Sequence, residues 1–487
     1  MKRTELKSKK KLLAAAVLTS GLMILAGCSG KSGITGEQLP YPLQVKAYFD
    51  KDMSNASRES TAPAAYFDLS DGIIVAYKTN PDCGAFLNQI TQKITSGESD
   101  VYAVANDTIM PLEMKQTALY NKIMDASSYR QIMAPIEKTL DKITSEGNSA
   151  LLVTDFEEYT PDRRVQHASF ATKYFKKWLV ENGDITFFVF NYSENRQDKH
   201  LYFIVFDTKD HHLLNKVREA TKGYSGYQEF CLSRDAYSSS NSYATATTGG
   251  SYHSAEHNED LVTAVVEDGS PEAYTRYGEG NRVEYYPLGE PWKNIVSNAR
   301  EMTQPGTKPL YTNLLRGLFF DFSNQDSYII RKLDVMVSDV EDDFTRFEEN
   351  RLAVTATNKE EDYHYDADGN MLPEYEYSAP GNIIQIKDML CIDQQLFDQS
   401  MKESGGSKVE IGINMTSSFT GQVIGGKEGD LLRVDVCIAE SEPNLGPRLD
   451  ELFFWGQNGS LRDAIRNTLQ EVNPRGTVIY TYFLKEL

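Results

Sequence analysis

Two aspartates that each follow an apolar run have the residue types and spacing for metal chemistry. Asp68 closes the first run and opens residues 68–72 (DLSDG), whereas Asp155 closes the second run, residues 150–155 (ALLVTD). Carboxylate and hydroxyl oxygens are hard ligands that suit Mg²⁺ or Mn²⁺. We therefore expect Asp68 and Asp155, together with hydroxyl oxygens, to form an oxygen-rich cation site.

A second interpretation of the same region is catalytic. Residues 155–159 (DFEEY) carry paired carboxylates, which can serve in acid–base chemistry, with Glu157 as the general base beside an ion on Asp68 and Asp155. Neighbouring acids on a loop point in different directions, however, and the sequence has no GxSxG, P-loop or strand-to-helix GxGxxG pattern. Binding is therefore favoured over catalysis, with a metal-dependent envelope hydrolase as the alternative.

Both aspartates also have a purely structural interpretation. Aspartate is common at turns and at helix N-caps, so neither residue needs a metal to explain it. In addition, Asp71-Gly72 lies between two apolar runs, which is a hairpin signal. If residues 73–77 formed a strand rather than a helix, the first half of the proposed site would be lost.

The elements that must position these residues alternate between strands and helices. Short apolar runs predict strands, and amphipathic spacing predicts helices between them. This alternation predicts an α/β fold with a doubly wound, mostly parallel sheet. Strands are expected at residues 64–69, 101–105, 108–112, 150–153, 185–190 and 201–206, and helices at 86–94, 133–143, 170–179 and 213–220.

This order resembles the von Willebrand factor A-like fold over residues 64–232. Residues 68–72 look like the family's DxSxS metal-adhesion motif, with Gly72 in place of the last serine. The run at 150–155 is similar to the strand that delivers the distal aspartate. The family's threonine loop corresponds to residues 125–140, where Ser127 and Ser128 are the nearest hydroxyl residues.

The resemblance implies a division of roles at the site. Asp68 and Ser70 would bind the ion directly and Asp155 would bind it through a water, leaving one coordination position for a carboxylate of a protein partner. Asp71, Ser128 and Glu157 are expected to surround the ion without binding it.

The N-terminus resembles a bacterial lipoprotein signal. Six basic residues within positions 2–11 precede an uncharged run at 12–26, too short for a membrane span. Residues 25–28 (LAGC) resemble the lipobox, in which the cysteine is lipidated after cleavage before it. We expect a lipid on Cys28 to hold the protein in the cell envelope, at the outer membrane, because residues 29–33 (SGKSG) are not acidic.

Charge and cysteine content restrict the partners. Residues 1–27 carry six basic residues and one acidic residue, so their removal changes the formal net charge from −20 to −25. A surface this acidic repels phosphate backbones, which excludes nucleic acid as a main partner. The later cysteines could form two disulfides or remain four buried thiols; they are Cys83, Cys231, Cys391 and Cys437.

Composition divides the chain into five parts. We predict a signal peptide at 1–27, a flexible tether at 28–60, the α/β domain at 61–235, a linker at 236–260 and a β-rich, sandwich-like module at 261–487. Residues 366–370 (DADGN) fit a hairpin turn better than a calcium loop. Tyrosines of the module could form a binding platform or pack across strands.

Together these features predict a lipid-anchored cell-envelope protein for binding or assembly. Its partners would be the membrane, through the lipid, and another protein, through the α/β domain.

Overall fold

The structure is a computed structural model, and it describes most of the chain from Tyr41 onwards. The chain divides into two units, Tyr41–Phe344 with Gly381–Leu487, and Met1–Pro40 with Thr345–Pro380. The second unit is described only at 345–355, the later part of helix α11 (Glu341–Thr355), and at Pro380. The described residues are 41–54, 62–97, 99–129, 133–159, 164–208, 211–234, 275–277, 283–288, 311–323, 325–355, 380–416, 431–456 and 458–486.

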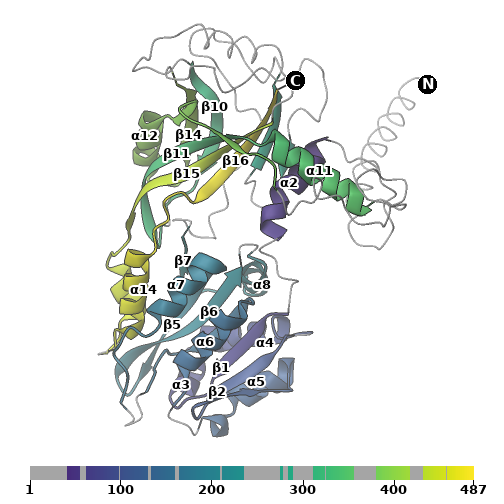
Figure 1. Cartoon of the computed structure of the whole chain (residues 1–487). Coiled ribbons are helices and arrows are strands. Elements are labelled where there is room, and N and C mark those ends of the chain that lie inside the picture. The colour runs from purple at the N-terminus through teal and green to yellow at the C-terminus, as the bar shows by residue number, and fades with distance from the viewer. Residues whose placement is uncertain are drawn as a thin grey trace, which may run out of the picture. The chain divides into compact units, whose positions relative to one another are not determined.

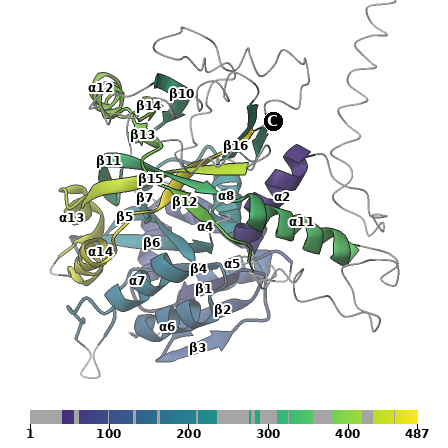
Figure 2. The same cartoon turned by 45° about the horizontal axis from the view of Figure 1, so that its top comes forward.

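A seven-stranded sheet forms the first half of the larger unit (Figures 1 and 2). Its strand order is β3-β2-β1-β4-β6-β5-β7. The strands are β1 (Ala64–Asp68), β2 (Val101–Ala105), β3 (Thr108–Pro111), β4 (Ala150–Thr154), β5 (Gly183–Glu194), β6 (Gln197–Thr208) and β7 (Gln228–Leu232).

The parallel part of this sheet is the group β2-β1-β4, in which β1 pairs in parallel with both neighbours. The other four strand pairs are antiparallel, although β5 runs in the same direction as the parallel group. The expected strands at 185–190 and 201–206 are longer than predicted and form a β-hairpin. Asn195 and Arg196 alone connect them, both with positive φ (51° and 67°), and a two-residue turn is too short for a parallel crossover.

Helices cover both faces of the sheet (Figure 2). Helices α6 (Ile136–Glu146) and α7 (Thr172–Glu181) pack on one face. The other face buries α3 (Ile73–Thr79), α4 (Pro81–Lys93), α5 (Gln116–Met124) and α8 (His212–Ala220). Because residues 73–79 are helical, the hairpin hypothesis for Asp71-Gly72 is wrong.

The described part of the C-terminal half is rich in strands, as predicted, and most of its strand pairs are antiparallel. A six-stranded sheet has the order β12-β11-β15-β16-β9-β8, and a three-stranded sheet has the order β10-β14-β13. Among these pairs, β16 and β9 are parallel. The strands are β8 (Thr275–Tyr277), β9 (Val283–Leu288), β10 (Tyr311–Phe320), β11 (Tyr328–Asp339), β12 (Ile384–Ile386), β13 (Leu390–Ile392), β14 (Val409–Met415), β15 (Leu431–Pro443) and β16 (Val478–Glu486).

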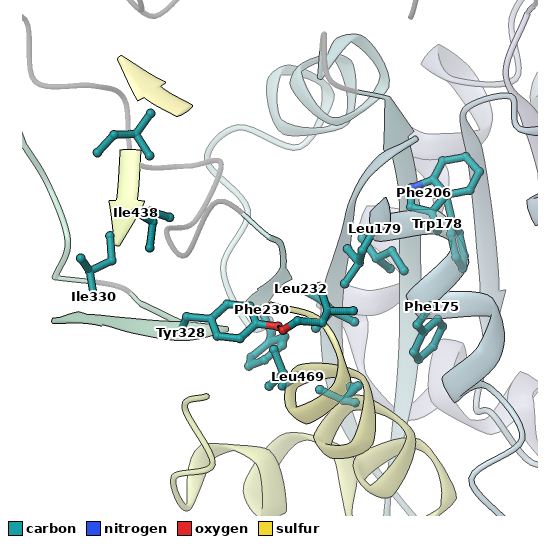
Figure 3. Packing of buried hydrophobic residues seen from close by; sticks show 14 of the residues in the cluster. Phe175, Trp178, Leu179, Phe206, Phe230, Leu232, Tyr328, Ile330, Ile438 and Leu469 are labelled. Carbon is teal, nitrogen blue, oxygen red and sulfur yellow. The ribbon is translucent and has the colours of Figure 1, made fainter. Parts of the chain in front are cut away.

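One hydrophobic cluster joins residues of both halves of this unit. Figure 3 shows Phe230 and Leu232 of β7 beside Tyr328 of β11 and Leu469 of α14 (Ser460–Glu471). Helix α13 (Arg448–Phe453) adds Phe453, whose ring lies 5.1 Å from that of Phe187. The described residues also form helix α12 (Gln394–Ser404) and a 3₁₀ turn at Ala126–Ser128.

Several predicted segments have outcomes of their own. Residues 41–54, placed in the flexible tether, form helix α2 (Tyr41–Ser54), because Val45 and Tyr48 bury an apolar stripe. The four later cysteines are thiols and not disulfides, so the disulfide alternative is wrong. Cys28, the signal peptide, the linker at 236–260 and the turn at 366–370 lie outside the described residues. Within the described residues, no helix is both long and apolar enough to cross a membrane.

Candidate functional site

Neighbouring parallel strands bring Asp68 and Asp155 to one edge of the sheet. Phe67 of β1 is in register with Val153 of β4, so Asp68 and Thr154 stand side by side where the strands end. The Thr154 hydroxyl donates a hydrogen bond of 2.7 Å to Asp68 Oδ2. Asp155 follows directly, at the carboxyl edge, where open α/β sheets bind ligands.

Asp68 is held by a local turn as well as by β4. Its Oδ1 accepts a 2.8 Å hydrogen bond from the Ser70 backbone N–H. Asp68 is 1% exposed, and burial raises its pKa to about 6 against the opposing effect of the Thr154 and Ser70 hydrogen bonds. The negative charge is therefore only partly compensated by the protein.

Asp155 is still less compensated. Its Oδ1 accepts from the Glu157 backbone N–H at 3.0 Å, but Oδ2 is buried and has no hydrogen-bond partner among the described residues. Asp155 is 0% exposed. Burial, followed by the charges of Glu157 and Asp68, raises its pKa well above the ordinary value.

Two tyrosine hydroxyls share this lack of partners. The hydroxyls of Tyr129 and Tyr192 are buried without a hydrogen bond to any described residue. Burial raises the pKa of each tyrosine, and the charge of Asp68 raises both further. One oxygen of the carboxylate pair and two tyrosine hydroxyls that interact electrostatically with the pair are thus unsatisfied, and buried groups of this kind normally hydrogen-bond to water or bind an ion.

Lys199, on β6, provides positive charge at this edge. Its Nζ lies 3.4 Å from Glu157 Oε1 and 3.0 Å from Glu194 Oε2, and its side chain is 11% exposed. Burial lowers the Lys199 pKa, but the charges of Glu157, Asp155 and Glu194 outweigh it, so the pKa is raised. Even with Lys199 in place, the pKa values of Asp68 and Asp155 stay raised, so one ammonium does not neutralise the group.

The glycine that departs from the family motif is explained by this geometry. Gly72 has φ +99°, and a Cβ placed on it would lie 3.2 Å from Glu194 Oε2. A serine there would be strained and would crowd the carboxylate that binds Lys199. The glycine at position 72 thus leaves room for the Glu194 carboxylate.

The β5–β6 hairpin extends past the end of β4 and encloses the site. Strand β4 ends at Thr154, opposite Tyr202, while the hairpin continues to its turn at residues 195–196. Ser70 and Glu157 are 2% and 6% exposed. A pocket of about 640 Å³ opens beside the hairpin, but Asp68, Asp155 and Glu157 are not among its lining residues.

The other residues predicted for the site are engaged elsewhere or exposed. Glu157 accepts from the Tyr159 hydroxyl at 2.8 Å and pairs with Lys199, so both of its oxygens are engaged. Asp71 is exposed. The Ser128 hydroxyl donates to the Lys122 carbonyl at 2.8 Å, a local contact after α5.

Sequence reasoning missed Tyr129, Tyr192, Glu194 and Lys199. Three of these belong to the hairpin, and the signal that could have placed them is the Asn195-Arg196 turn between two apolar strands. Tyr129 adjoins Ser128, but an isolated tyrosine carries no pattern that distinguishes a site from a core.

Among the residues that the structure describes, no three His, Cys, Asp or Glu side chains are grouped to hold a metal ion. A cation here would rest on two carboxylates together with hydroxyl oxygens. No protein-family model matches the chain. No curated protein and no solved structure matches it either.

Proposed function

We propose that this chain is a lipid-anchored cell-envelope protein that binds a protein partner through its α/β domain, with a divalent cation enclosed at the carboxyl edge of the sheet. The observation that carries the proposal is the unsatisfied Oδ2 of Asp155 in a pair of buried carboxylates, with the unsatisfied Tyr129 and Tyr192 hydroxyls in electrostatic contact with the pair. The proposal includes a von Willebrand A-like fold for residues 61–235 and a sandwich-like module after it.

The residues fit an oxygen-binding cation. Asp68, Ser70 and Asp155 would hold Mg²⁺ or Mn²⁺, with water completing the coordination. When bound, the ion would neutralise the carboxylates whose pKa values are raised without it. Because the hairpin encloses this position, the ion would fix the shape of the edge, and a partner would contact the exposed surface around Asp71 and the hairpin turn.

Hydrolysis is less well supported than binding. A general base needs an oxygen available to water or substrate, whereas Glu157 is 6% exposed and uses both oxygens for Tyr159 and Lys199.

Anchoring rests on Cys28 and is tested separately. Labelled palmitate should be incorporated into the protein in growing bacteria, and Cys28→Ser should abolish incorporation and release the protein from the membrane fraction. Membrane attachment of the Cys28→Ser protein would contradict the anchor.

The cation is tested by thermal unfolding of the purified full chain in detergent, with MgCl₂ or MnCl₂ added after EDTA treatment. An ion that binds only the folded state adds about 2.7 kcal/mol at a hundred times its dissociation constant, so Tm should rise. Asp155→Asn should abolish the rise. Asp71→Asn, which removes an equal charge from an exposed position, should keep it. An equal rise in all three proteins would indicate only general screening of acidic charge.

Partner binding is tested by placing a photo-crosslinking amino acid at Asp71 in the native bacterium. We expect one discrete crosslinked envelope protein, lost with Asp155→Asn and retained when the crosslinker is used with Glu181→Gln, an exposed acid at the end of α7. A product that is unchanged by Asp155→Asn would disconnect the partner from the site.

A further inference from the structure

Lys199 lies between the buried carboxylates and the C-terminal half of the unit. On one side its ammonium pairs with Glu157 and Glu194. On the other side it lies 5.1 Å from the centroid of the Trp455 ring, a cation–π distance. Both side chains are nearly buried, Trp455 being 9% exposed, so the contact is shielded from solvent.

Trp455 follows a segment that attaches to the seven-stranded sheet. Directly before it, α13 packs Phe453 against Phe187 and Phe230, with ring centroids 5.1 and 5.0 Å apart. The Tyr202 hydroxyl donates a 3.1 Å hydrogen bond to the Leu452 carbonyl. Lys199 and Tyr202 are close together on β6, so one strand contacts both the acidic edge and the α13 segment.

We propose that Lys199 is an internal competitor for the cation, and that cation binding at Asp68 and Asp155 displaces its ammonium and loosens its contact with Trp455. This inference rests on the proposed cation site and states how that site is regulated and what it signals. Cation binding at the sheet edge would thereby change the contacts of the segment that follows α13 in the C-terminal half.

The physical reason is repulsion at close range in a buried place. The Lys199 charge already interacts with Asp155 and Glu157, the same negative charges that would attract a divalent cation. Two cations in one enclosed group repel each other strongly because solvent screening is weak there. The ammonium is the mobile partner, since it sits at the end of a flexible four-carbon side chain.

The first test is the affinity of the full chain for Mg²⁺ or Mn²⁺, measured by calorimetry. Lys199→Met should tighten binding roughly tenfold or more, because it removes the repelling charge. Lys199→Arg should stay near wild type. Lys142→Met is the matched control, since Lys142 also combines an ion pair, with Glu146, and a ring contact, 5.1 Å from Tyr102. Equal tightening by Lys199→Met and Lys142→Met would overturn the proposal.

The second test is tryptophan emission in a Trp178→Phe, Trp292→Phe protein, which leaves Trp455 as the reporter. Adding Mg²⁺ should shift its emission, and Lys199→Met should remove the response while the ion still binds. Binding of the ion without any change at Trp455 would overturn the inference and leave the cation site intact. No binding to wild type, and none to Lys199→Met, would instead refute the cation site itself.

Discussion

The two ends of strand β4 each adjoin a buried aspartate, and the two are stabilised in different ways. At the amino end, Asp207 is 1% exposed, and its oxygens accept from the Ser149 hydroxyl (2.8 Å) and from the backbone N–H groups of Thr208 (3.0 Å) and Leu214 (2.6 Å). At the carboxyl end, Asp155 is equally buried, but Oδ2 has no donor among the described residues.

The difference separates a structural carboxylate from a candidate ligand-binding one. Asp207 satisfies the first turn of α8, where backbone N–H groups lack partners and an acidic group is stabilising. Asp155 accepts only the Glu157 N–H among the described backbone groups, and its charge is repelled by those of Glu157 and Asp68. Burial alone therefore does not identify the site; the unsatisfied oxygen does.

The largest expected effect comes from removing the satisfied carboxylate. Asp207→Ala would leave the Leu214 N–H buried without its acceptor and would remove the nearer partner of the part-buried Ser149 hydroxyl, so we expect a loss of about 2 to 4 kcal/mol in the free energy of unfolding. Urea unfolding followed by circular dichroism measures it. If Asp207→Ala lost less stability than Asp155→Ala, Asp155 and not Asp207 would be the more important structural carboxylate.

At the carboxyl end of β4, replacing the aspartate should raise the free energy of unfolding instead of lowering it. Asp155→Asn removes an uncompensated buried charge and keeps the Oδ1 acceptor for the Glu157 N–H, so the EDTA-treated protein should gain about 1 to 2 kcal/mol. The same urea titration measures the gain. If stability fell instead, Asp155 would be structural, like Asp207.

Much of the α/β half could be predicted from sequence, because its signals are local. Strand β2 begins and ends where the alternation predicts, and α6 and α7 follow their apolar stripes. The β5–β6 hairpin was not predicted, since the buried runs of both strands resemble parallel strands when the two-residue turn is overlooked. The order of strands beyond β4 depends on that turn.

The part of the site that could be predicted from sequence is its two aspartates with Ser70 and Glu157, which follow them closely in the chain. Apolar runs that end in Asp68 and Asp155 place both at the carboxyl edge of neighbouring parallel strands, and the register confirms that position. Lys199 and Glu194 reach the same edge through the hairpin, so their roles depend on pairing that no local pattern fixes. Trp455 is further away still, 300 residues beyond Asp155 in sequence.

A smaller effect concerns pH and again distinguishes the acidic edge. The Asp68 pKa is raised from 3.8 to about 6, so the folded protein binds a proton that the unfolded chain releases between those values. Stability contributed by this group therefore falls as pH rises through that window, by at most about 1.4 kcal/mol per pH unit. Asp68→Asn should flatten the dependence, measured by urea unfolding from pH 4 to pH 7 in EDTA. An unchanged slope would show that other buried acids, such as Asp326, produce it.

The smallest effects come from deleting one hydroxyl at each end of β4. Ser149→Ala removes one donor to Asp207 and leaves the backbone donors Thr208 and Leu214, so a loss of about 1 kcal/mol is expected, without a change in the response to Mg²⁺. Thr154→Val removes the donor to Asp68 Oδ2 and the acceptor for the Phe156 N–H, so its loss should be similar or slightly larger. Its distinguishing consequence is electrostatic: without the Thr154 hydrogen bond the folded pKa of Asp68 should rise further, so the upper end of the pH window in the previous experiment should move upward while its lower end stays. If the two variants have the same pH and Mg²⁺ dependence, the ends of β4 do not differ in the way proposed, and the acidic edge is a buried structural cluster.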